Sequence, residues 1–218
     1  MRIVALLLAL VTPLLACAEQ AEPAKPAFDE GKHYTVIAGQ PKPAATGPIK
    51  VTEVFWYGCG HCYTFEPHIQ GWKKTKADDV KFVGSPAMWK QRVQPQDLMW
   101  THAKLYYTAS AMGKLDLLHP AFFEAMHLKN MRLVAPEEIK KVVSEKGVDG
   151  DLFLKTMESF AVNAQVNQAD QRQKTFKVTG TPEIVVGDYY HVSASKAGGQ
   201  KEMIDVINFL VDKVRKER

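Results

Sequence analysis

The apolar pattern of the chain predicts strands near its start and helices in its middle. A short β-like run covers 33–37, and 49–57 is a strand rich in β-branched and aromatic residues. Residues 80–83 predict another strand. From about 95 to 165 the pattern changes to several helical stretches. Breaks between these stretches are predicted at Gly113, His119-Pro120, Ala135-Pro136 and Gly147 to Gly150.

The last third of the chain predicts a helix, a β-hairpin and a closing helix. Residues 164–176 form the first of these helices, and 201–214 are amphipathic, with apolar side chains on one side. Strands and helices therefore mix along the chain, which predicts an α/β fold with a helical insertion at about 91–165. The hairpin has a strand at 183–186, a tight turn at Gly187-Asp188 and a return strand at 189–193.

The N-terminus predicts export from the cytoplasm. Residues 1–16 combine one arginine with an apolar run that is too short to span a membrane and suits a signal peptide. Two cleavage sites fit. An A-x-A site would start the mature chain at Glu19, whereas a lipobox-like sequence would leave Cys17 as a lipidated first residue. Residues 17–27 are rich in Ala, Glu and Pro and predict a flexible tether before a domain at 28–218.

Composition narrows the class of protein. The chain has 218 residues, of which 46% are hydrophobic and 24% charged, as in ordinary globular domains. Its net charge of +4 is too small to indicate a nucleic-acid partner. Three cysteines exclude a disulfide scaffold. No apolar run reaches the roughly 18–20 residues of a membrane-spanning helix.

The candidate chemistry lies at Cys59-Gly60-His61-Cys62. Two cysteines three positions apart at the start of a helix can bring their sulfurs together, and the helix N-terminus stabilises a thiolate on the first one. Protonated His61 adds positive charge. A stabilised thiolate makes the disulfide form easy to reduce and therefore oxidising. The alternatives are an inert structural disulfide or half of a metal site, but a zinc site needs a second Cys/His pair.

Four further positions complete the candidate site. Pro67 either kinks the helix that follows the cysteines or ends it. The Thr181-Pro182 bond, at the head of a strand, is a candidate cis peptide. Glu53 is an acid on a buried strand, where it is either a proton acceptor beneath the cysteines or a solvated glutamate facing the sheet edge. Glu66, one turn past Cys62, is a modulator or a solvated acid.

Histidines outside the motif carry no functional signal in the sequence. They do not cluster, so each is expected to be structural or exposed. This expectation concerns His102, His119, His127 and His191.

These motifs together resemble the DsbA family of bacterial periplasmic thiol oxidases, which has a thioredoxin fold with an inserted helical domain. The resemblance rests on Val54 to Tyr57 before the cysteines, Tyr63 to Glu66 after them, and Glu30 to Tyr34 near the start. The chain departs from the family at Gly60, where proline is frequent. The resulting Gly-His pair between the cysteines is also the pair that disulfide isomerases of the same superfamily use. It also has Gly84 where the family's buried lysine is expected.

The resemblance implies a monomeric enzyme that passes the disulfide of Cys59 and Cys62 to newly exported proteins. It implies no cofactor beyond this disulfide, reoxidation by a DsbB-like membrane protein, and a cis Thr181-Pro182 bond facing Cys59. The backbone of Thr181 would then pair with an extended substrate segment. Two other functions remain open on the sequence alone: a disulfide reductase or isomerase of the same fold, and a copper carrier that uses Cys59, His61 and Cys62.

Overall fold

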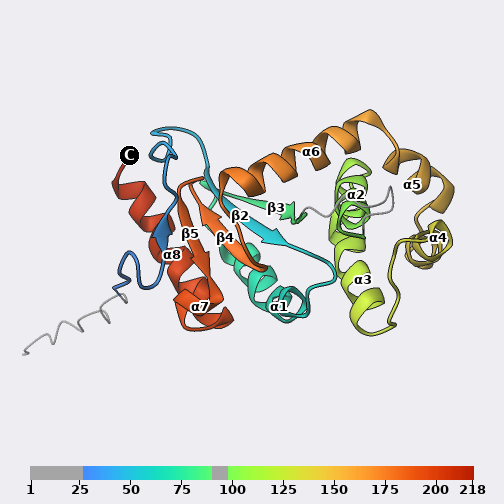
Figure 1. Cartoon of the computed structure of the whole chain (residues 1–218), viewed down its shortest axis with the longest axis horizontal. Coiled ribbons are helices and arrows are strands. Elements are labelled where there is room, and N and C mark those ends of the chain that lie inside the picture. Colours follow the sequence, from blue (N-terminus) through green and yellow to red (C-terminus); the bar gives the residue numbers. More distant parts are fainter. Residues whose placement is uncertain (1–26, 90–97) are drawn as a thin grey trace, which may run out of the picture.

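The computed structural model describes residues 27–89 and 98–218, which form a mixed β-sheet with helices around it (Figure 1). Within these residues the sheet has five strands in the order β1-β5-β4-β2-β3. Strand β2 lies between β4 and β3 and pairs in parallel with β3 and antiparallel with β4, which is the arrangement of a thioredoxin-type sheet. The strands are β1 (Thr35–Val36), β2 (Ile49–Phe55), β3 (Val80–Pro86), β4 (Glu183–Val186) and β5 (Tyr190–Ser193).

Two long helices share an apolar core with one face of the sheet. Phe65 and Ile69 of α1 and Leu210 of α8 are fully buried in the same cluster as Ile49 and Val51 of β2. Each helix buries one side because its apolar residues recur at intervals of three and four. The two long helices are α1 (Gly60–Thr75) and α8 (Gln200–Lys216), and the short helix α7 (Ala194–Ala197) precedes α8.

The remaining helices form a block beside the carboxyl end of β2 (Figure 1). Their apolar core also contains Phe55, Tyr57 and Cys62, so the end of β2 and the start of α1 are built into the block. This shared core positions the candidate site between the sheet and the block. The helices are α2 (Leu98–Ala111), α3 (Leu115–His127), α4 (Pro136–Glu145), α5 (Gly150–Met157) and α6 (Phe160–Thr175).

Most elements occur where the sequence predicts them, but one predicted break is wrong. Helix α3 continues through His119 and Pro120. Proline removes one helical hydrogen bond, and here the carbonyl that loses its donor belongs to the exposed residue Asp116. Leu118 and Phe122 on the opposite side of the helix are fully buried, and this packing holds the helix together. Helix α1 likewise continues past Pro67.

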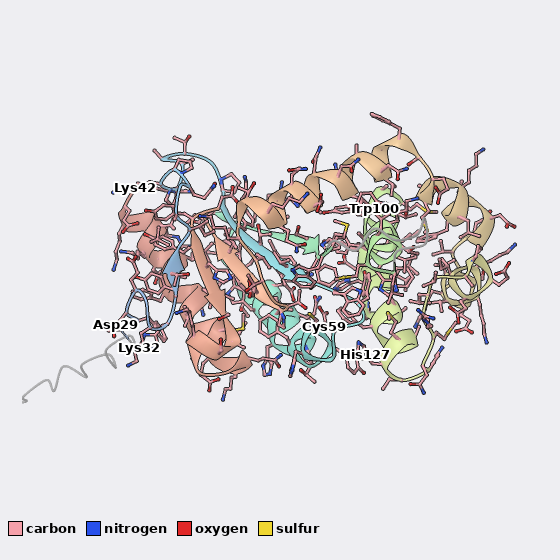
Figure 2. All side chains as sticks on the ribbon, in the orientation of Figure 1. Asp29, Lys32, Lys42, Cys59, Trp100 and His127 are labelled. Carbon is pink, nitrogen blue, oxygen red and sulfur yellow. The ribbon has the colours of Figure 1, made fainter. Side chains whose placement is uncertain are left out.

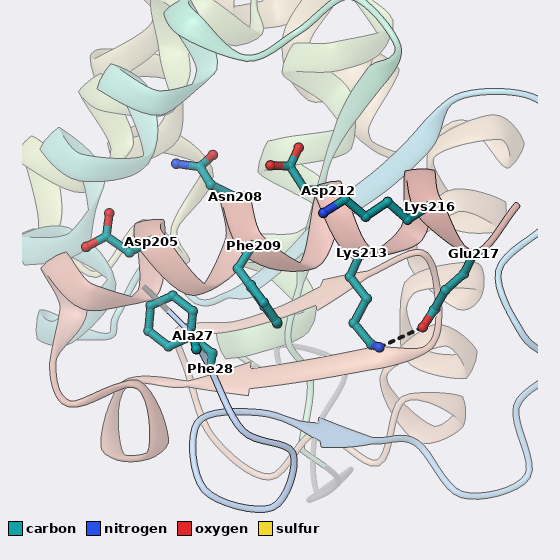
Figure 3. Close-up of a pocket in the computed structure, with 9 residues that line it drawn as sticks. All are labelled: Ala27, Phe28, Asp205, Asn208, Phe209, Asp212, Lys213, Lys216 and Glu217. Atoms are coloured by element: carbon teal, nitrogen blue, oxygen red, sulfur yellow. Dashed lines mark ion pairs between the residues drawn. The ribbon is translucent and has the colours of Figure 1, made fainter. Parts of the chain in front are cut away.

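In the described part of the chain, no helix is long and apolar enough to cross a membrane. The predicted signal peptide at 1–16 and the tether up to residue 26 lie outside the described residues, so both stay predictions. A surface groove of about 570 Å³ lies on the outer side of α8, where the rings of Phe28 and Phe209 are 5.5 Å apart (Figure 3). Neither Cys59 nor Cys62 lines this groove.

Candidate active site

The two cysteines of the motif have very different surroundings. Cys59 is the N-cap residue of α1 and is half-buried, whereas Cys62 lies in the first turn and is fully buried. Both are free thiols. Cys59 lies at the end of α1 that faces the helical block (Figure 2). Only Cys59 is therefore accessible to a thiol from another molecule.

The surroundings of Cys59 stabilise its thiolate form. The hydrogen bond from the Cys62 thiol is the main cause, and it outweighs the opposing effect of burial. Hydrogen bonds from Thr181 and from the backbone of His61 and Cys62 act in the same direction, and together they lower the pKa of Cys59 to about 5. Burial raises the pKa of Cys62 far above its ordinary value. The pair thus has one stable thiolate and one stable thiol.

The loop before β4 brings a distant part of the chain to the cysteines. The Cys59 Sγ lies 3.3 Å from the carbonyl oxygen of Thr181, to which it donates when the thiol is protonated. The Thr181–Pro182 peptide bond is cis, so this prediction is confirmed. His61 is exposed, and a side chain at Gly60 would point into open space. The middle of the motif is therefore surface.

Glu53 lies beneath the cysteines in the middle of the sheet. Its exposed fraction is 2%, so the alternative of a solvated glutamate at the sheet edge is wrong. Among the described residues, its Oε1 has no hydrogen-bond partner. Burial, followed by the negative charge of Glu66, raises the pKa of Glu53 well above its ordinary value. Both effects favour the protonated form of the carboxyl group.

Glu66 is mostly buried, so the alternative that it is a solvated acid is wrong. Its carboxylate accepts hydrogen bonds from His119 Nε2 at 3.2 Å and from Gln70 Nε2 at 3.0 Å. Burial opposes ionisation, but these interactions and the charge of Lys73 outweigh it and lower the pKa of Glu66. Glu53 and Glu66 line one cavity of about 480 Å³. The two acids line the same cavity, but their pKa values are shifted in opposite directions.

Tyr106 occupies the space next to Gly84, the position at which the family's buried lysine is expected. Gly84 of β3 is the pairing partner of Glu53 in β2. A side chain at Gly84 would clash with the Tyr106 hydroxyl, because Tyr106 of α2 packs directly onto the Gly84 backbone. Lys73 of α1 also lines the cavity, and its charge lowers the pKa of both acids.

The histidines do cluster in space, contrary to the sequence expectation. Three from the helical block contact the segment Trp56-Tyr57, which directly precedes the motif. His191 of β5 binds Glu183 instead, with 2.6 Å between Nε2 and Oε2. Of the three histidines that contact this segment, His102 binds Trp56 Nε1 and His119 binds the Tyr57 hydroxyl. His127 binds the Tyr57 carbonyl oxygen.

Glu183 is a second buried acid of the site that the sequence analysis did not single out. It follows Pro182 directly, and its Oε2 accepts from the Thr179 N–H at 3.3 Å. The Glu183 carboxylate therefore connects the beginning of the loop that carries Thr181 with strand β5. It binds the loop at the Thr179 N–H and the strand at His191. An acid next to a Thr-Pro dipeptide was the available sequence signal.

No group of three or more His, Cys, Asp or Glu side chains that could hold a metal ion occurs within 27–89 and 98–218. The chemistry that the described residues support is that of the two sulfurs. A half-exposed thiolate at a helix N-terminus, a buried second thiol and a thioredoxin-type sheet define a thiol:disulfide oxidoreductase. Residues 50–205 match the DSBA-like thioredoxin domain family. The chain belongs to the DsbA family.

Relatives and solved structures agree with this family. The chain is 35% identical to the thiol:disulfide interchange protein DsbA of Pseudomonas aeruginosa, over 94% of this chain and 96% of that protein. It is 37% identical to DsbA of Pseudomonas syringae, over 91% and 88% respectively. The crystal structure of Pseudomonas aeruginosa DsbA superposes with a TM-score of 0.79 and 36% identity, covering 87% of this chain and 96% of that one.

Proposed function

We propose that Cys59 and Cys62 are the redox pair and that their disulfide oxidises thiols of newly exported proteins. The observation that carries this proposal is the half-buried Cys59 at the N-terminus of α1, where hydrogen bonds from the Cys62 thiol, Thr181 and the backbone lower its pKa to about 5. A thiolate stabilised in the reduced enzyme makes the reduced form stable and the disulfide form a good oxidant. The low pKa therefore supports an oxidase rather than a reductase.

The reaction balances as two thiol–disulfide exchanges. A substrate thiolate attacks the Cys59 sulfur of the enzyme disulfide, which forms a mixed disulfide and releases Cys62. A second substrate thiolate then attacks the substrate sulfur of that bond and releases the Cys59 thiolate. The substrate loses two electrons and two protons. Both electrons pass to the enzyme, Cys62 takes one proton, and the other proton goes to solvent because Cys59 stays ionised above about pH 5.

Glu53 supplies the proton that Cys62 needs in this scheme. Burial of the carboxyl group favours its protonated form, and its negative charge when ionised raises the pKa of Cys62, so the two groups influence each other. The cavity that Glu53 lines gives it a path for exchanging the proton again. The proposed role of Glu53 is thus a proton donor during oxidation of substrate and an acceptor during reoxidation.

Thr181, Pro182, Gly60 and His61 form the proposed substrate surface. The Thr181 carbonyl lies beside the Cys59 sulfur, so an extended segment that pairs with this loop brings its cysteine to the attacked atom. Backbone pairing reads little of the substrate sequence, which favours a broad range of unfolded proteins. Gly60 leaves the surface open, and exposed His61 adds positive charge when protonated.

The remaining partners and the location follow from the family and the N-terminus. We propose a periplasmic enzyme that is reoxidised by a DsbB-like membrane protein and uses no cofactor besides its own disulfide. Relatives over most of the chain are named thiol:disulfide interchange protein DsbA. Anchoring through Cys17 stays a separate proposal, with an ordinary signal cleavage before Glu19 as its alternative.

Oxidation of a reduced dithiol peptide by the purified, oxidised enzyme tests the proposed function. We expect stoichiometric formation of peptide disulfide by the wild type and its loss in both Cys59→Ser and Cys62→Ser, because neither variant can hold the Cys59–Cys62 disulfide. Reduction of insulin and reshuffling of a scrambled protein, measured in parallel, test the reductase and isomerase alternatives. An enzyme that performs only these two reactions, or that is reduced in cells at steady state, would contradict the proposed direction.

A further inference from the structure

We propose that His102, His119 and His127 are positioning residues for the cysteine pair and act through Trp56 and Tyr57. The inference rests on the proposed function, in which Cys59 and Cys62 are the redox pair. All three histidines come from the helical block, so the block would set the properties of the cysteines as well as cover them.

Each histidine binds a different group of two consecutive residues. The Trp56 indole N–H donates to His102 Nδ1 at 3.0 Å. The Tyr57 hydroxyl lies 2.7 Å from His119 Nδ1. The His127 Nε2–H donates to the Tyr57 carbonyl oxygen at 2.8 Å. The segment is thereby fixed at both side chains and at its backbone.

Each histidine is in turn held by its own second contact. His102 Nε2 donates to the Arg132 carbonyl oxygen at 2.9 Å, and because its Nδ1 accepts from Trp56, this ring has a single fitting tautomer. His119 Nε2 donates to Glu66 at 3.2 Å. The His127 ring stacks on Tyr63, with centroids 4.8 Å apart and a 9° angle between the planes. The histidines therefore form rigid supports rather than loose contacts.

The segment that they hold makes backbone contacts with both cysteines. The Trp56 carbonyl oxygen accepts the Cys59 N–H at 3.0 Å. A hydrogen bond from the Trp56 backbone reaches the Cys62 sulfur and acts to lower its pKa. A shift of Trp56 and Tyr57 would thus move the backbone groups that place one cysteine and stabilise charge on the other. This is the path from the histidines to the sulfurs.

A purely structural role is the competing explanation. Tyr57 is fully buried, and its hydroxyl needs a partner whether or not the site is affected. Such a role predicts a loss of stability alone. Positioning predicts that the pKa of Cys59 and the exchange equilibrium with glutathione change as well, since both report on the sulfurs.

His127 offers the sharpest test because it is only half-buried and the variant should fold. His127→Leu removes the donor to Tyr57, His127→Gln keeps an N–H donor at a similar position, and His68→Leu changes an exposed histidine of α1 as a matched control. The thiolate absorbance of the reduced protein gives the pKa of Cys59, and equilibration with glutathione gives the exchange constant. Circular dichroism checks the fold.

We expect His127→Leu to make the enzyme a weaker oxidant by about threefold to tenfold, which corresponds to one hydrogen bond. The pKa of Cys59 should rise in parallel. His127→Gln and His68→Leu should stay close to wild type. Trp56→Phe removes the indole donor to His102 and should shift both readouts in the same direction, which gives a second measurement if His127→Leu does not fold.

Folded His127→Leu and Trp56→Phe proteins with the wild-type exchange constant and Cys59 pKa would overturn the inference. His127→Gln that behaves as His127→Leu would also overturn it, because the hydrogen bond would then not be the cause. A wild-type enzyme that exchanges no disulfides would instead contradict the proposed function. The two failures are therefore distinguishable.

Discussion

At the scale of single residues, the site depends on the inequality of two identical side chains. Cys59 is half-buried at a helix N-terminus and has a pKa of about 5, whereas burial raises the pKa of Cys62. A nucleophile attacks the accessible sulfur and displaces the buried one. The position of each cysteine, rather than its chemistry, assigns its role.

The pH dependence of alkylation tests this inequality. In the reduced protein, the rate at which iodoacetamide modifies Cys59 should be half-maximal near pH 5, because the thiolate is the reactive species. Cys62 should remain unmodified over the same range. Peptide mass spectrometry distinguishes the two sites, and a half-maximal rate near pH 8 or 9 would contradict the stabilised thiolate.

The same shift affects the stability of the reduced protein. The pKa of Cys59 falls from 9.0 to about 5 on folding, so the stabilisation is complete above about pH 9 and is lost as the pH falls to about 5. The difference in melting temperature between reduced wild type and Cys59→Ser should therefore grow between pH 5 and pH 9. A difference that is constant over this range would refute the linkage.

The pKa of Glu53 is shifted in the opposite direction, so its effect on stability changes with pH in the opposite way. Its raised folded-state pKa means that folding takes up a proton above pH 4.5, so its stabilising contribution is lost as the pH rises from there. Glu53→Gln should therefore be more stable than wild type at pH 7, and the gain should vanish near pH 4. The disulfide exchange that releases Cys62 should be slower in Glu53→Gln by about 10²-fold, which is the low end of the rate increase that general acid–base catalysis provides. Chemical denaturation and stopped-flow measurements check the two effects, and a variant with wild-type kinetics would exclude the proton role.

At the scale of elements, β3 and α2 are fitted to each other at one glycine. Gly84 lets Tyr106 approach the strand backbone beside Glu53. The cavity between β2, α1 and α3 is bounded by this contact. A larger residue at Gly84, including a lysine, has no room while Tyr106 is in place.

Gly84→Ala should destabilise the protein by about 1–3 kcal/mol, because the added methyl group overlaps the Tyr106 hydroxyl and the elements must shift. Gly71→Ala is the matched control. Gly71 lies in α1 with open space around it, and alanine there should stabilise the helix by about 0.5–1 kcal/mol. Urea denaturation of both variants measures the difference. Equal stabilities would show that Tyr106 moves aside without cost.

At the scale of the whole molecule, the sheet and the helical block share the site between them. The sheet supplies Glu53 and the loop with Thr181, α1 supplies the cysteines, and the block supplies three histidines. No single part contains the whole site. The block is therefore expected to influence the redox chemistry as well as substrate access.

The anchor prediction also belongs to the whole molecule. If Cys17 is lipidated, Cys17→Ser should move the protein from the membrane fraction to the soluble periplasmic fraction, because the lipid chains are the attachment. Fractionation followed by intact-mass analysis measures this. A wild-type mature chain that starts at Glu19 without lipid would refute the anchor.

The parts of the fold that depend on short-range patterns can be predicted from the amino-acid sequence alone. The Cys59–Cys62 spacing, the strand before it, the hairpin and the amphipathic helix follow from residue periodicity and turn chemistry, and the structure has them near the predicted bounds. The exception was the break at Pro120, because buried contacts elsewhere in α3 outweigh the lost hydrogen bond. The roles of Glu53 and Cys17 stay predictions.

Which distant residues support the cysteines depends on long-range packing and could not be predicted from the sequence. The histidines that bind Trp56 and Tyr57 are 46 to 70 positions away in the chain, and no local periodicity encodes such a contact. The same holds for the ionisation of Glu66, which depends on His119, and for Gly84, whose missing side chain is explained by Tyr106. Periodicity specifies which face of an element is buried, but packing of the complete chain decides what that face meets.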